Sequence, residues 1–210
     1  MLKNLKLGTK LIVSYIIVAL IAGIIGLVGI TKIHQIDNAD TKLYEKITVP
    51  LGDLAAMSID FQRVRINLRD ATDAKDPAEA KAAWDTAAKL RNDISEHGEK
   101  FEKTILTDEG RKLFAEFKEA RKVYGGYMDR VRELDEAGRK PEALALVHGD
   151  AKKAALHEQE MLNKLMESKE GQAKLTSDSN SREAGTASTI MIVLIAVGVI
   201  LAVGFGLVIT

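Results

Sequence analysis

Two apolar segments decide the fold of this chain: Leu11–Ile30, LIVSYIIVALIAGIIGLVGI, and Ile190–Ile209, IMIVLIAVGVILAVGFGLVI. Neither contains a charged residue. A helix needs about 20 such residues to cross the hydrocarbon core of a bilayer. The sequence therefore predicts transmembrane helices at 11–30 and 189–210. Because both lie near the chain ends, we expect residues 31–188 on one side of the membrane and both ends on the other.

The orientation is predicted from Lys3, Lys6 and Lys10, which precede the first apolar segment without any acidic residue among them. The positive-inside rule places residues 1–10 in the cytoplasm. We expect residues 31–188 to be periplasmic or extracellular, and the protein to lie in the inner (cytoplasmic) membrane. A cleaved signal peptide is the alternative, but its apolar region is about 7 to 15 residues long. The longer run here, which continues into Thr31, favours an uncleaved anchor.

The composition restricts what the intervening domain can be. The chain has three prolines and no cysteine, and it is rich in the helix formers Ala, Leu, Glu, Lys and Arg. Disulfides and thiolate chemistry are excluded. The formal net charge of zero argues against nucleic acid, and no Gly-rich phosphate loop occurs. The sequence thus indicates a helical domain, with no cofactor expected.

Interruptions of the apolar periodicity predict four helices: from the first span to about residue 71, from 76 to 101, from 107 to 137, and from about 141 into the second span. Pro50 is expected to kink the first helix, Asp76 to cap the second and Gly138 to end the third. The second and third helices, at about 45 Å each, match in length. The predicted fold class is all-α: an up-down-up-down antiparallel four-helix bundle flanked by two transmembrane helices.

Three short motifs accompany this layout: MLKNLKLGTKL at 1–11, RINL at 65–68, and LDEAG at 134–138 followed by EAL at 142–144. With the spans and the bundle, they resemble the N-terminal half of methyl-accepting chemotaxis proteins, of the kind seen in aspartate and serine receptors. The resemblance covers all 210 residues. In that family the second span leads into a HAMP linker and a cytoplasmic coiled coil, so the chain is expected to be a truncation.

The resemblance implies a transmembrane chemoreceptor. Such a receptor would sense a small, anionic periplasmic ligand (a carboxylate, an amino acid or an aromatic acid), form a homodimer, and control a cytoplasmic kinase through an adaptor. The expected mechanism is that ligand binding far from the membrane displaces the fourth helix relative to the first. Because the fourth helix continues into the second span, this displacement would reach the cytoplasm.

The candidate ligand-binding residues in the first predicted helix are Arg63, Arg65, Asn67 and Arg69. On a helical wheel Arg65 and Arg69 lie between two apolar arcs, one of which contains Ile59 and Ile66. The other arc consists of Leu54, Met57, Phe61, Val64 and Leu68. Two guanidinium groups one turn apart suit bidentate recognition of a carboxylate. The alternative is that these arginines are ordinary surface residues, neutralised by Asp60, Asp70 and Asp73.

The resemblance implies that arginines at this level hold the ligand carboxylate across the dimer interface. Arg65 matches through its Arg-Ile-Asn-Leu context. Arg69 lies one residue out of register and no third arginine follows, so the specificity for aspartate or serine is not carried over. The opposing contacts are expected from the start of the fourth helix, at His148 and Gly149, where the family's hydroxyl group is missing.

Other classes of function are less well supported by the residues. His148 and His157 lack the spacing of a helical zinc site, and no nucleophile, base and orienting group stand together, so we expect neither a metal site nor an enzyme. Two alternatives stay open: the sensor domain of a membrane histidine kinase, and a membrane-anchored module that docks a periplasmic protein. Small residues at 198, 202 and 206 predict close helix packing in the membrane.

Overall fold

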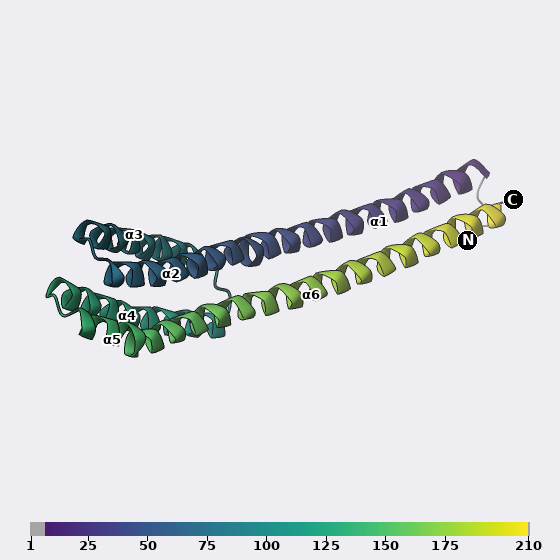
Figure 1. The fold of residues 1–210 in the computed structure, drawn as a ribbon. Helices are drawn as coiled ribbons and strands as arrows, with labels where there is room; N and C mark the ends of the chain where they lie inside the picture. The colour runs from purple at the N-terminus through teal and green to yellow at the C-terminus, as the bar shows by residue number, and fades with distance from the viewer. Residues whose placement is uncertain (1–6, 210) are drawn as a thin grey trace. The chain divides into compact units, whose positions relative to one another are not determined.

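The computed structural model describes residues 7–209. Within that range all regular structure is helical, which confirms the predicted all-α class. The elements in chain order are α1 (Leu7–Leu43), the π-helix η2 (Tyr44–Thr48), α2 (Val49–Asp73), α3 (Pro77–Glu102), α4 (Asp108–Glu136), α5 (Lys140–His148) and α6 (Asp150–Ile209) (Figure 1).

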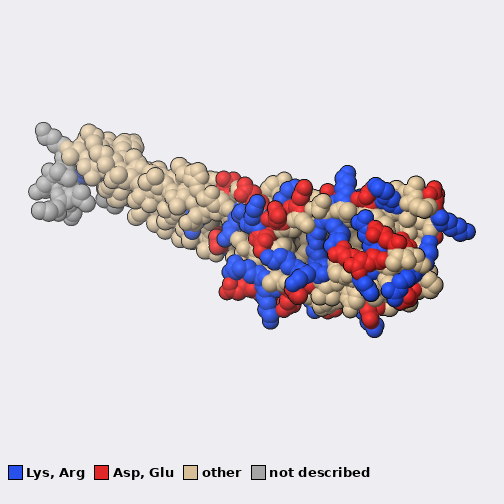
Figure 2. Space-filling model, turned by 90° about the vertical axis from the view of Figure 1, so that its left-hand side faces the viewer, with Lys and Arg blue, Asp and Glu red and all other residues tan. Residues whose placement is uncertain are grey.

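The chain divides into two compact units. One contains the apolar ends of the chain, up to Lys42 and from Leu175 onward, and the other is the bundle, Leu43–Lys174. Figure 2 shows that the charged side chains gather over the bundle, whereas the apolar helices carry almost none. The bounds 31–188 for the extramembrane domain, and 11–30 and 189–210 for the spans, stay predictions.

The apolar unit contains two helical segments that are long and apolar enough to cross a membrane, and no residue of either apolar window is buried. They pack closely at two glycines. A Cβ atom on Gly198 would lie 3.2 Å from Cγ2 of Ile21, and one on Gly29 would lie 3.1 Å from Cε of Met191. Gly198, part of the predicted small-residue pattern, therefore packs against the other apolar helix of the same chain.

The bundle consists of four long helices, α2, α3, α4 and the first part of α6, with short corners between successive antiparallel neighbours, as the sequence predicts. Its core is filled by the stripes that each helix presents every three or four residues. Large side chains buried in it include Leu54, Phe61, Leu68, Leu90, Ile94, Phe101, Phe117, Met128, Leu162 and Leu165. The edge-on contact between Phe61 and Tyr124, with ring centroids 5.6 Å apart, joins α2 to α4.

Capping groups fix the ends of α3 and α4 where the sequence predicts them. The carboxylate of Asp76 accepts a 2.9 Å hydrogen bond from the backbone N–H of Ala78, and the hydroxyl of Thr107 accepts one of 3.1 Å from Gly110. At the end of α4, Gly138 adopts φ +71°, which lets Arg139 N–H donate to the carbonyl of Leu134 at 2.8 Å. This Schellman arrangement requires glycine at the left-handed position.

The helices depart from the prediction in two places. The irregular turn near Pro50 is the π-helix Tyr44–Thr48, which comes just before the proline and ends with Val49 N–H bonded to the Tyr44 carbonyl. The continuous fourth helix predicted from about residue 141 is wrong at Gly149, which separates α5 from α6. Gly149 N–H bonds to the Ala145 carbonyl, and a Cβ atom on Gly149 would lie only 2.9 Å from that oxygen.

Candidate functional site

The two central arginines of the predicted site do lie together with a third cation. Arg65 and Arg69 on α2 and Lys152 on α6 line one depression, which contains no carboxylate; the remaining lining residues are Leu68, Tyr124, Val147, Ala151 and Ala155. The depression has a volume of only about 10 Å³ in a single chain. That is room for about one water molecule, so a ligand here needs side-chain movement or a second subunit.

The three arginines of the predicted site differ in their side-chain contacts. Arg65 donates to the neutral side chain of Gln62 at 2.9 Å and lies 5.9 Å from the ring centre of Phe61. Arg69 forms no hydrogen bond or ion pair with another side chain among the described residues. Only Arg63 is paired as the surface interpretation expects, with Asp60 at 3.1 Å.

The other predicted site residues lie elsewhere. Asn67 donates to the backbone carbonyl of Arg63 at 2.8 Å, so its side chain folds back onto α2. His148 is exposed at the end of α5, and Gly149 follows it; neither lines the depression, whereas their neighbour Val147 does. The structure therefore brings Arg65 and Arg69 together and leaves Arg63, Asn67, His148 and Gly149 outside. Residues 7–209 contain no group of three potential metal ligands.

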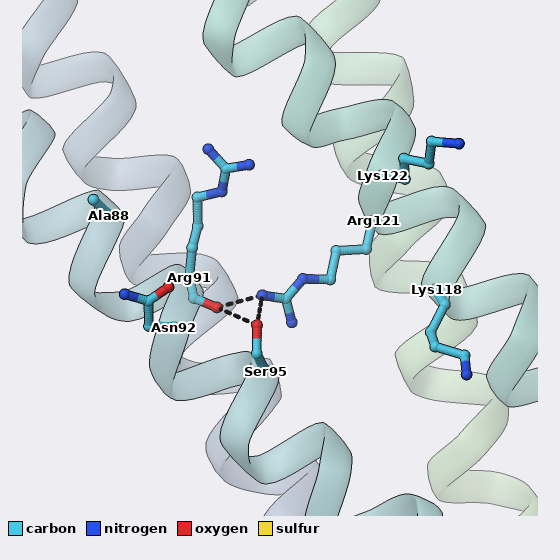
Figure 3. A pocket seen from close by; sticks show the side chains of 7 residues that line it. All are labelled: Ala88, Arg91, Asn92, Ser95, Lys118, Arg121 and Lys122. Carbon is cyan, nitrogen blue, oxygen red and sulfur yellow. Dashed lines mark hydrogen bonds between the residues drawn. The ribbon is translucent and has the colours of Figure 1, made fainter.

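A larger cationic groove, between α3 and α4, is absent from the sequence-based prediction. It has a volume of about 430 Å³ and is lined by Ala88, Arg91, Asn92 and Ser95 of α3 and by Lys118, Arg121 and Lys122 of α4 (Figure 3). Arg121 reaches across it, donating to Ser95 Oγ at 2.9 Å and to the backbone carbonyl of Arg91. The sequence shows the helical spacing of these residues within each helix. It does not show that these sides of α3 and α4 face each other.

A buried carboxylate lies behind this groove. Glu158 on α6 is 2% exposed, and its Oε2 atom has no hydrogen-bond partner within the described part of the chain. Glu158, Arg91 and Arg121 line the same narrow internal gap. Burial raises the pKa of Glu158 to about 7, while the positive charges of Arg121 and Arg91 act in the opposite direction.

The structure is thus a helical bundle between two apolar segments, with cations collected on its faces. The chain belongs to a family described as the four helix bundle sensory module for signal transduction, whose model matches residues 4–184. The chain is also similar to a protein of Acetivibrio thermocellus assigned as a sensory transducer, with 31% identity over 106 residues. The match covers 50% of this chain and 19% of that relative. No solved structure matches the chain significantly.

Proposed function

We propose that this chain is the sensory part of a transmembrane chemoreceptor that binds a small periplasmic anion and controls a cytoplasmic kinase. Membership of the sensory-module family supports a role in signal transduction. The observation that carries the anionic ligand is the set of Arg65, Arg69 and Lys152 around one depression that contains no carboxylate. Guanidinium groups favour carboxylates because their paired N–H donors match both oxygen atoms.

The small volume of the depression supports a site completed by a second subunit. Ile59 and Ile66 are 61% and 55% exposed, and they lie seven residues apart on α2. Residues at this spacing share one helix face. We propose that this face pairs with its copy in a homodimer, which would place the arginines of α2 beside the interface. The ligand would then contact both subunits.

The proposed route of transmission is α6. This helix runs from Asp150 to Ile209 and so contains both bundle residues, among them Lys152, and the second apolar segment. A ligand that binds one position of α6 more tightly than another shifts the population toward that position. The proposed orientation, with the bundle periplasmic and the inner membrane as location, follows from the positive charges before the first span.

The proposal is tested on the whole chain in lipid nanodiscs by screening carboxylates, amino acids and aromatic acids for thermal stabilisation. Each hit is repeated on Arg65→Ala and Arg69→Ala, with Arg63→Ala as the matched control because Arg63 already pairs with Asp60. We expect the first two substitutions to abolish stabilisation and the control to retain it. Hits that survive loss of Arg65 and Arg69 would overturn the site, and a silent screen from a folded dimer would favour the docking of a periplasmic protein.

A further inference from the structure

The groove between α3 and α4 carries an excess of positive charge. Of its four cations, Lys118 pairs with Glu102 at 2.8 Å and Arg91 with Asp129 at 3.1 Å. Both pairs are solvent-exposed and therefore weak. Arg121 donates only to neutral oxygens, and Lys122 forms no ion pair within residues 7–209. Two of the four cations thus have no carboxylate partner, and they lie in a concave surface of about 430 Å³.

The donors in the groove belong to two helices, with Arg91 on α3 and Lys118, Arg121 and Lys122 on α4. Figure 3 shows Arg121 extending from α4 toward Ser95 on α3, with Lys118 on the same helix. The guanidinium of Arg91 has room because residue 125 is glycine: a Cβ atom there would lie 2.8 Å from Nη2 of Arg91. The groove can therefore offer guanidinium donors from both helices, and the lysines that line it belong to α4.

The buried carboxylate of Glu158 links this groove to α6. Arg91 and Arg121 line the solvent-facing groove and also the internal gap that contains Glu158. Neither arginine forms an ion pair with Glu158 among the described residues. The two guanidinium groups therefore stand between two sites for negative charge, one open to solvent and one buried on α6.

We propose that the α3–α4 groove binds a small dianion with its charge on oxygen atoms, such as a dicarboxylate or a sulfate-like oxyanion, and that binding is coupled through Arg91 and Arg121 to the protonation of Glu158. This site shares no residue with the Arg65–Arg69 depression. It does not depend on the ligand proposed there. Its contribution would be a second input to α6 of the same sensory module.

The sign of the coupling follows from the charges around Glu158. The residues that share its internal gap are the cations Arg91 and Arg121, the phenol Tyr124, and the uncharged Phe61, Val64, Ile94, Gly125 and Met128. On α6 itself, the neighbouring His157 is exposed and faces Glu160 at 3.8 Å. A dianion in the groove offsets the positive field of the arginines, so Glu158 holds its proton more tightly. By linkage, protonated Glu158 strengthens anion binding.

The experiment is calorimetric titration of the whole chain in nanodiscs with oxalate and with sulfate, which both keep two negative charges between about pH 6 and 8. We expect binding that is at least about threefold tighter at the lower pH. Arg121→Gln and Lys122→Gln should each weaken binding by about fivefold or more. Arg130→Gln is the matched control, because Arg130 lies on α4 outside the groove and pairs with Glu133 at 2.7 Å.

The coupling has its own test in Glu158→Gln, which should bind the same anions with an affinity that no longer changes with pH. His157→Gln, a change at the exposed neighbour, should leave the pH dependence intact. Binding that is unaffected by Arg121→Gln and Lys122→Gln, or absent for both anions, would overturn the site. A pH dependence that persists in Glu158→Gln would overturn the coupling. Because Lys122 is exposed, its substitution tests the site even where Arg121→Gln disturbs folding.

Discussion

The side-chain ammonium of Lys169 donates a 2.8 Å hydrogen bond to the backbone carbonyl of Lys46. In a regular α-helix that carbonyl would accept from residue 50, but Pro50 has no N–H. Lys169 also donates to the carbonyl of Thr104 at 2.8 Å, in the corner between α3 and α4, and its ammonium lies 5.4 Å from the ring centre of Phe101. One side chain of α6 thus bonds both the π-helix and the corner of the bundle.

Replacing Lys169 with methionine should destabilise the bundle. The side chain is 2% exposed, and its loss leaves two backbone carbonyls without their donor. We expect a loss of about 1 to 3 kcal/mol in the free energy of unfolding. The control is Lys164→Met, because Lys164 is an exposed residue of α6 paired with Glu160 at 2.7 Å and should change stability by less than about 0.5 kcal/mol. Urea unfolding followed by the fluorescence of Trp84, the single tryptophan, measures both; equal losses would contradict the role of Lys169.

The stability of the bundle should fall as the pH rises toward neutrality. Burial raises the pKa of Glu158 from 4.5 to about 7, so the folded state binds more protons than the unfolded state between these values. The stabilisation is fully present below the pKa that Glu158 has in the unfolded state. It is lost as the pH rises through the pKa that Glu158 has in the folded state. The free energy of unfolding should therefore fall by about 2 to 3 kcal/mol between about pH 5 and 8.

Unfolding of the whole chain at a series of pH values measures this effect, with Glu158→Gln as the comparison. The amide does not titrate, so the fall in stability between about pH 5 and 8 should be absent from the variant. Glu160→Gln is the matched control, since Glu160 is exposed and neighbours Glu158 on α6. An unchanged pH profile in Glu158→Gln would show that another group is responsible.

Features of this fold that depend on nearby residues could be predicted from the sequence, whereas a feature that depends on a specific atomic contact could not. The length of the apolar segments predicted two helices that could span a membrane. Local chemistry at Asp76, Thr107 and Gly138 predicted helix ends, because a cap depends on residues within one turn. The break at Gly149 was missed because it arises from a contact with the Ala145 carbonyl, and isolated glycines occur in helices without breaking them.

In the candidate site, too, positions within one helix could be predicted, whereas neighbours on different helices could not. The helical wheel places Arg65 and Arg69 near each other because both belong to a single helix, and both line one depression in the structure. It could not place Lys152 beside them, or Arg91 opposite Arg121, because those neighbours depend on which helices pack together. The burial of Glu158 and Lys169 could not be predicted from the sequence either. Charged residues are seldom buried, and only tertiary contacts identify the exceptions.

Two glycines of the bundle should respond oppositely to alanine. At Gly149 a Cβ atom would lie 2.9 Å from the backbone oxygen of Ala145, which cannot move aside cheaply, so Gly149→Ala should lower the free energy of unfolding by about 1 to 3 kcal/mol. Gly171 lies inside α6 with nothing within 4 Å of such an atom. Gly171→Ala should therefore raise stability by about 0.5 to 1 kcal/mol. Urea unfolding compares the two, and a stabilising Gly149→Ala would contradict the close approach.

The proposed dimer face predicts where two copies can be cross-linked. Because the chain contains no cysteine, Ile66→Cys introduces a single thiol on the exposed side of α2. If α2 pairs with its copy about a two-fold axis at this level, the two thiols should oxidise to a disulfide-linked dimer in nanodiscs. Val123→Cys is the matched control, since Val123 is 47% exposed, against 55% for Ile66, but lies on α4.

Non-reducing electrophoresis after mild oxidation measures the outcome. We expect a covalent dimer from Ile66→Cys and little from Val123→Cys, whose thiols would face away from each other. Ile66→Lys should in addition lower the dimer fraction in sedimentation, because two buried like charges would oppose each other across the axis. Efficient cross-linking through residue 123 rather than 66 would move the interface to α4, and would then separate the Arg65–Arg69 depression from the second subunit.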